Sequence, residues 1–167
     1  MAQIGCFVPA KSLKLAPLSQ IFALNDVPES NMFSLSQFGM QLTLLSSALR
    51  RANSSSLVLL DEFGQGTSHA EGAALFVSCV KYWAKLGGHS PLILAATHLH
   101  DAVTFFSQNT TLNNIFLMSM GYLIENGQLV FLYQPVADMR GNSFPFSVAQ
   151  VIGIPEHVVS RGKEVID

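Results

Sequence analysis

Apolar residues recur at every third or fourth position between residues 35 and 49, and this spacing predicts a helix with one apolar face. Ser34, followed three residues later by Gln37, has the form of a capping box at the start of this helix. The residues expected on the apolar face are Leu35, Phe38, Leu42, Leu45 and Leu49.

A second helix is predicted from about Ala70 to Leu86, because the same spacing returns there and stops at Gly87-Gly88. Its expected buried residues are Ala73, Phe76, Val77, Val80 and Ala84. A shorter helix is predicted over residues 99–107.

Short apolar runs predict strands between these helices. LVLL at 57–60 and PLILAAT at 91–97 are typical of buried strands, and two weaker runs lie at Leu13–Leu15 and Ile21–Leu24. Strands that alternate with helices indicate right-handed crossovers and a mostly parallel sheet. The predicted fold class is therefore α/β.

The last third of the chain predicts a hairpin followed by helices. Asn126-Gly127 separates two apolar strands, and this dipeptide is a strong hairpin signal, so we expect an antiparallel addition to the sheet. Residues 144–153 and 155–167 are expected to form two closing helices. The start, MAQIG, has the pattern of a helix tail ending at Gly5, and both ends of the chain are abrupt, so we expect a piece of a longer protein.

Composition narrows the class of protein. The chain has 167 residues, enough for one domain with a real core, and 49% of them are hydrophobic. No apolar run reaches the roughly 18 residues that span a bilayer, so no membrane partner is expected; strands buried on both faces, or a surface for a partner, would explain the apolar content.

Charge and cysteine content exclude other classes. Net charge is −2 with only 9 Lys and Arg residues, which gives no electrostatic footprint for nucleic acid, so any DNA contact of the protein would lie elsewhere. Cys6 and Cys79 have no metal-ligand spacing and fit a reducing compartment.

Two charged or polar pairs follow the predicted strands directly. Asp61-Glu62 follows LVLL, and Thr97-His98 follows LILAA. Ligands of open α/β sheets bind beyond the carboxyl ends of the strands, so a Mg²⁺-holding Asp, a water-activating Glu and a phosphate-contacting His are expected there. Each part also has an interpretation without a function. Asp61 and Glu62 could be acidic residues where a strand leads into a loop, His98 could be a hydrogen-bonded histidine at a strand end, and Gly64 and Gly66 could form a tight turn.

Taken together, SLVLLDEFGQGTS, the following Glu71-Gly72, LILAATH and the closing RGKEV resemble the ATPase domain of the MutS family of DNA mismatch-binding proteins, which are ABC-type ATPases. The resemblance covers essentially the whole chain. Phe63, together with ESNMFSLS, LVFLYQ and RGKEV, is most similar to the meiotic, crossover-promoting branch, the fifth of the eukaryotic series; repair branches usually have Ile or Leu at that position.

The resemblance implies roles for the strand-end residues. Asp61 resembles the Walker B carboxylate that holds Mg²⁺, Glu62 the residue that activates water, and His98 the switch histidine. The segment that resembles the D-loop, which faces a partner subunit, consists of Gly64, Gln65, Gly66 and Thr67.

The family's signature segment, usually Ser-Thr-Phe-Met, aligns with residues 36–39. Ser36 would reach the γ-phosphate of ATP bound to the other subunit, and its place at a helix start favours an anion. Gln37 and Gly39 depart from the pattern, and Gln41 replaces a usual acid.

One family element is absent from the sequence: no G-x-x-x-x-G-K-[ST] motif occurs in it. We expect residues 1–153 to be part of a MutS-type ATPase domain and residues 154–167 to begin the helical dimerisation element. The implied cofactors are ATP and Mg²⁺, and the implied partners are a second MutS homologue in a heterodimer and DNA bound by domains absent from this chain.

The implied location is the nucleus, and the implied process is meiotic recombination. Two alternatives stay open. The chain could be a nucleotide-free piece that acts only in dimerisation or interaction, or it could belong to a generic P-loop enzyme such as a helicase.

Overall fold

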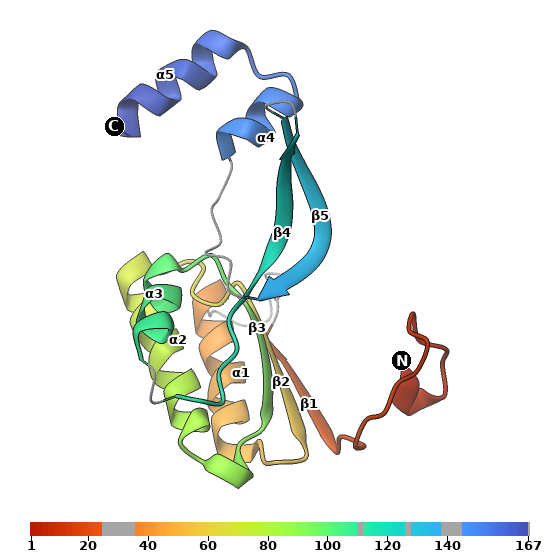
Figure 1. Cartoon of the computed structure of the whole chain (residues 1–167). Coiled ribbons are helices and arrows are strands. Elements are labelled where there is room, and N and C mark those ends of the chain that lie inside the picture. Colours follow the sequence, from red (N-terminus) through yellow and green to blue (C-terminus); the bar gives the residue numbers. More distant parts are fainter. Residues whose placement is uncertain (25–35, 110–111, 126–127, 138–144, 167) are drawn as a thin grey trace. The chain divides into compact units, whose positions relative to one another are not determined.

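Three parallel strands form the sheet of the first part of the chain. The computed structural model describes residues 1–24, 36–109, 112–125, 128–137 and 145–166, and it divides into two compact units, residues 1–115 and 116–167. In the first unit the strand order is β1-β2-β3, formed by Gln20–Leu24, Ser56–Asp61 and Leu92–Ala96 (Figure 1). The predicted α/β class and parallel sheet are confirmed.

The helices of this unit lie on one side of the sheet (Figure 1). They are α1 (Gln37–Arg51), α2 (His69–Ala84) and α3 (His100–Gln108), with short 3-10 helices η1 (Ala2–Ile4) and η2 (Gly87–His89). Between them and the sheet lies a core whose largest side chains, Trp83 and Phe63, are almost fully buried. Among the described residues, no helix is long and apolar enough to cross a membrane.

Because helices cover only one face of the sheet, β3 differs from its prediction as a buried strand. Ile93 faces the core and is half-buried, whereas Leu92 and Leu94 are 62% and 67% exposed. Ile21 in β1 pairs in register with Leu57 of β2, which in turn pairs with Leu92 of β3, and Ile21 is 62% exposed. The expectation that the strands are buried on both faces is therefore wrong for β1 and β3 in this structure.

The observed helix starts are set by two serines. Ser68 caps α2: its Oγ accepts from the Glu71 amide at 3.3 Å, as in a capping box, and donates to the Glu71 carboxylate at 2.8 Å. Ser36 caps α1 by accepting from the Gly39 amide at 3.2 Å. The predicted capping box at Ser34 lies outside the described residues, as does Leu35.

The buried faces of the helices agree in part with the predicted ones. In α1 the predicted Leu45 is buried together with Gln41 and Ala48, while Phe38, Leu42 and Leu49 are partly buried. In α2 the predicted Ala73, Phe76 and Val80 are buried, Trp83 is fully buried, and Val77 and Ala84 are only partly buried.

Two predictions for the first residues need correction. Leu13 and Leu15 form no strand and are 53% and 42% exposed, because no described segment pairs with them. The start is a single 3-10 turn, not the end of an α-helix, although Gly5 ends it in the left-handed conformation as expected.

The second unit, residues 116–167, contains an antiparallel hairpin and two helices. β4 (Met118–Glu125) pairs with β5 (Gln128–Ala137), which confirms the hairpin, while Asn126-Gly127 lies outside the described residues. Among the described residues these strands form a two-stranded sheet of their own, so the expected addition to the parallel sheet is not observed. The register shifts between Met120 and Tyr122, around Gly121. The helices α4 (Pro145–Val151) and α5 (Glu156–Ile166) confirm the two closing helices.

Candidate functional site

The strand ends bring three of the expected residues to one edge of the sheet. Asp61 ends β2 in register with Ala96, the last residue of β3, and the Glu62 amide donates to the Ala96 carbonyl at 3.0 Å. His98 follows two residues later and is exposed. The prediction that the two polar strand ends are neighbours is confirmed.

Glu62 has an unusual backbone conformation. Its φ is 46°, in the left-handed region that residues other than glycine rarely adopt. Such strain costs on the order of 1–3 kcal/mol and is concentrated at functional sites, where a side chain must point in one direction. The sharp change of direction after β2 leaves the Glu62 side chain exposed beside the strand end.

The Glu62 carboxylate is held by a neighbour in the same loop. The Gln65 side-chain amide donates to Glu62 Oε2 at 2.5 Å. A carboxylate has two oxygens and several lone pairs, so this bond fixes the group and leaves room for it to accept a proton from water. The sequence did not predict this contact, because the expected role of Gln65 was toward a partner subunit.

Glycines shape the loop that follows. Gly64 and Gly66 have φ of 99° and 86°, and a Cβ on Gly64 would lie 3.2 Å from the Gly72 backbone. The tight-turn interpretation of these two glycines is thus correct, and it also explains how the loop packs against the start of α2. Thr67 completes the loop, with its hydroxyl 3.3 Å from the Glu71 carboxylate.

Ser36 lies at the exposed start of α1. Its oxygen is used as an acceptor by the helix cap, but a hydroxyl also has a proton to donate. The helix start supplies further NH groups and a partial positive charge, which favour an anion. Ser36 can therefore bind a phosphate oxygen without giving up its cap.

The first two turns of α1 pack against the loop after β2. The Phe38 and Phe63 rings are 6.1 Å apart between centroids, and Phe63 is only 1% exposed. Gln41 Oε1 accepts from the Gly64 amide at 3.2 Å. These contacts place the helix that carries Ser36 beside the loop that begins with Glu62.

A second histidine lies beside His98. His69, the first residue of α2, has its ring centroid 6.1 Å from that of His98. Sequence spacing gave no sign of this pair, because His69 and His98 are 29 positions apart in the sequence. The parallel pairing of β2 and β3 brings the segments that follow these strands together.

The donor set suits Mg²⁺ better than a transition metal. Asp61 supplies a hard, exposed carboxylate oxygen, and Mg²⁺ commonly binds one or two carboxylates and keeps several waters. In the described part of the chain, no group of three His, Cys, Asp or Glu residues could hold a metal ion alone. The exposed Asp61 carboxylate could hold a Mg²⁺ that keeps most of its waters, and it does not form an all-protein site.

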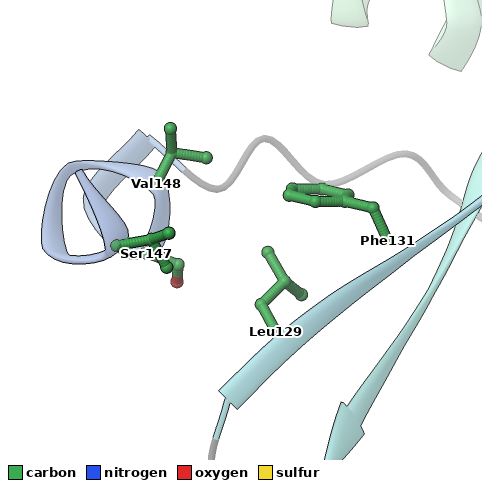
Figure 2. Close-up of a pocket in the computed structure, with 5 residues that line it drawn as sticks. Leu129, Phe131, Ser147 and Val148 are labelled. Carbon is green, nitrogen blue, oxygen red and sulfur yellow. The ribbon is translucent and has the colours of Figure 1, made fainter.

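Two hollows in the described residues are lined by none of the residues of this edge. One, of about 220 Å³, lies between α1 and α2 and is lined by Leu49, Ser78, Cys79 and Tyr82. The other, of about 110 Å³, is lined by Val151 and by the residues labelled in Figure 2, where Leu129 and Phe131 of β5 face Ser147 and Val148 of α4. Both linings are almost wholly apolar, which suits neither a phosphate nor Mg²⁺.

Comparison with known proteins gives consistent matches. The family model described as MutS domain V matches residues 1–167. Proteins called DNA mismatch repair protein MutS are similar to the chain. The protein from Caulobacter sp. (strain K31) is 34% identical over 167 residues, which is 100% of this chain and 18% of the relative. The protein from Lactobacillus gasseri is 36% identical over 166 residues, 99% of this chain and 19% of the relative.

A third relative, from Bacillus velezensis, is 32% identical over 166 residues, again 99% of this chain and 19% of the relative. The chain thus spans about a fifth of the length of the curated relatives that it matches.

Proposed function

The chain belongs to the MutS domain V family, which has an ABC-type ATPase fold, and on that premise we propose that it is the ATPase-domain portion of a MutS-homologue DNA-binding protein. In this proposal ATP is bound and hydrolysed at an interface between two subunits. The parent protein acts on mismatched or branched DNA through domains outside this chain.

One observation carries the proposal: Asp61, Glu62 and His98 meet at the carboxyl ends of two adjacent parallel strands. This is the edge at which open α/β sheets bind their ligands. An acidic exit from a strand would explain Asp61 and Glu62 alone. It would not explain the left-handed Glu62 backbone or the bond that holds its carboxylate.

Each side chain has a distinct task in the proposed reaction. Asp61 would hold Mg²⁺ through an oxygen, directly or through water, and bound Mg²⁺ would neutralise charge on the phosphate oxygens. Glu62 accepts the proton of a water that it orients, with Gln65 fixing the carboxylate. His98 donates a hydrogen bond to the terminal phosphate.

The second subunit completes the site in this proposal. Ser36 donates its hydroxyl proton to the γ-phosphate of ATP held by the partner, and the loop of Gly64, Gln65, Gly66 and Thr67 faces that partner. The exposed position of Ser36 at a helix start supports this assignment. The P-loop for the phosphates is not encoded in these 167 residues.

The test is Glu62→Gln in the assembled protein that carries this chain. Because a positioned general base contributes about 10²–10⁴-fold, hydrolysis should slow by that factor while ATP binding is retained. Asp61→Asn should instead weaken the Mg²⁺-dependent part of binding. Glu125→Gln, at the exposed end of β4, is the matched control. A Glu62→Gln protein that hydrolyses ATP at the normal rate would refute the assignment.

We further propose the meiotic, crossover-promoting branch of the family, with a nuclear location and a different MutS homologue as the heterodimer partner. Phe63 supports this choice, because its buried ring fills the space against Phe38 where repair branches usually have Ile or Leu. The test compares affinities of the heterodimer for a four-way DNA junction and for a duplex with one mismatch at the same salt concentration. Preference for the mismatch would point to a repair branch.

A second candidate is an interaction piece that binds no nucleotide. Its support is the absent phosphate-binding motif, together with a second unit whose strands expose apolar residues such as Ile124 and Tyr133, 69% and 82% exposed. Co-purification of this chain with a full-length MutS homologue, unchanged by Asp61→Asn, would favour it.

A further inference from the structure

Gln41 is a polar residue in the middle of the buried face of α1. Its side chain is 0% exposed, and its neighbours on that face, Leu45 and Ala48, are 3% and 0% exposed. A buried amide is costly unless its polar atoms are bonded, so a glutamine here needs a reason.

The reason is a bond to the loop that follows β2. Gln41 Oε1 accepts from the backbone amide of Gly64 at 3.2 Å, across 23 positions of sequence. Because Gly64 offers only an N–H there, the oxygen of the side-chain amide must face it. The NH₂ group then points elsewhere, and Nε2 finds no acceptor among the described residues.

An aromatic contact also joins α1 to the loop. The Phe38 ring packs against Phe63, and a Cβ on Gly66 would lie 3.7 Å from the Phe38 Cβ. The aromatic contact is apolar and tolerates sliding, whereas a hydrogen bond to a backbone amide fixes direction. The Gln41–Gly64 bond is therefore a directional contact from α1 to the loop, and it acts two residues after Glu62.

We propose that Gln41 is a positioning residue that couples the start of α1 to the Glu62 loop. When Ser36 binds a phosphate of the partner's nucleotide, α1 shifts, and the Gln41–Gly64 bond moves the loop that contains Glu62 with it. The proposal rests on the proposed function for the roles of Ser36 and Glu62. The bond itself and its coupling of helix to loop can be tested without nucleotide.

A neutral amide suits this task in this chain. The resemblance places an acid at this position in the family, and an ionised carboxylate in so buried a place would need further partners. The amide accepts from Gly64 without charge, at the cost of an unpaired NH₂.

Amide hydrogen exchange measured by NMR on the chain tests the bond. Gln41→Met is a variant of similar size that has no acceptor. In it, exchange of the Gly64 amide should accelerate about 2- to 13-fold while the amides of α1 keep their rates, because a neutral hydrogen bond contributes about 0.5–1.5 kcal/mol. Gln41→Glu, whose buried carboxyl is favoured in its neutral form, keeps a carbonyl acceptor without a buried charge and should keep exchange at Gly64 slow. Thr43→Ala, on the exposed face of the same helix, is the control and should leave Gly64 unchanged.

If Gln41 only fills space, the opposite result is expected: the Gly64 amide stays protected in Gln41→Met and loses protection in Gln41→Glu. That result would overturn the proposal. If Gln41→Met fails to fold, the unmodified chain can still be used to test the hydrogen bond. A through-bond NMR coupling between the Gly64 nitrogen and the Gln41 side-chain carbonyl carbon is expected, and its absence would overturn the bond.

A double-variant comparison tests the coupling. Ser36→Ala should change Gly64 exchange by about 2-fold or more in the unmodified chain, a fraction of what an N-cap contributes, and should add nothing in Gln41→Met. An equal change in both backgrounds would show that the signal does not pass through Gln41.

Hydrolysis by the assembled protein then separates this proposal from the proposed function. Gln41→Met should lower kcat for ATP and leave KM unchanged, because the residue touches no nucleotide. An unchanged kcat despite altered Gly64 exchange would refute the positioning role. If Glu62→Gln hydrolyses ATP normally, the proposed function fails while the exchange results still stand.

Discussion

Substitution of Ser36 separates a structural role from a role toward a nucleotide, because the same hydroxyl serves both. In the structure Ser36 Oγ accepts from the Gly39 amide at 3.2 Å and caps α1. Loss of an N-cap costs about 0.5–2 kcal/mol, and because the residue is exposed we expect Ser36→Ala to lower the free energy of unfolding by about 1 kcal/mol.

The role of Ser36 toward the nucleotide should contribute more free energy than the helix cap, and its loss should be measured at the partner subunit. A hydrogen bond to a charged group contributes about 1.5–3 kcal/mol, or about 10- to 150-fold in an equilibrium constant. Ser36→Ala should therefore weaken nucleotide binding at the partner's P-loop by that factor and leave the P-loop of its own subunit nearly unchanged. Nucleotide crosslinking to each subunit of the reconstituted heterodimer, measured separately, gives both values.

Ser36→Asp distinguishes the two roles. Aspartate is as good an N-cap as serine, so stability in urea should stay within about 0.5 kcal/mol of the original. Its carboxylate has no proton to donate at neutral pH and repels phosphate, so the partner's site should fail as in Ser36→Ala or worse. Ser36→Thr keeps both cap and donor and should restore binding.

Two results would refute this reasoning. Loss of crosslinking on the mutated subunit's own P-loop would make Ser36 a residue of its own site, and the two-subunit model would fail here. Normal crosslinking in Ser36→Asp would show that the hydroxyl only caps the helix.

Three further predictions follow from the structure and sequence. The isolated chain should show no useful affinity for Mg-ATP by titration calorimetry, because no phosphate-cradling motif is present, and micromolar binding would contradict this. Gly64→Ala should lower the free energy of unfolding by about 1–3 kcal/mol because φ is 99° and the Cβ would press on the Gly72 backbone. Gly88→Ala, with open space around it, should be near neutral, and equal losses would show that Gly64 is unstrained. Burial raises the pKa of the Cys79 thiol above its value in the unfolded chain. The protonated thiol therefore contributes stability at pH values below the pKa of the unfolded chain, and this stability is lost as the pH rises through the pKa of the folded protein. An aromatic disulfide should react with Cys6 well before Cys79, and equal rates would contradict this.

The sequence alone was sufficient for the features that depend on local pattern. Apolar spacing predicted α1 and α2, the Asn126-Gly127 dipeptide predicted the hairpin, and continuous apolar runs predicted β2 and β3 to within a residue or two. The polar residues directly after those runs marked the candidate site, because the carboxyl ends of parallel strands face the same edge. The roles of Asp61, Glu62, His98 and Ser36 stay predictions until they are tested.

Only the tertiary structure decided how the parts meet. Helical spacing marks a buried stripe, but it does not say which polar residue belongs inside it, so Gln41 was identified only as a departure from a family pattern. Its burial became visible once α1 packed on the loop after β2, where the Gly64 amide needed an acceptor. The left-handed backbone of Glu62 and the bond from Gln65 have the same origin, since a turn's conformation depends on what it packs against. The open face of the sheet likewise depends on which side the helices occupy, and no apolar run of five or six residues contains that information.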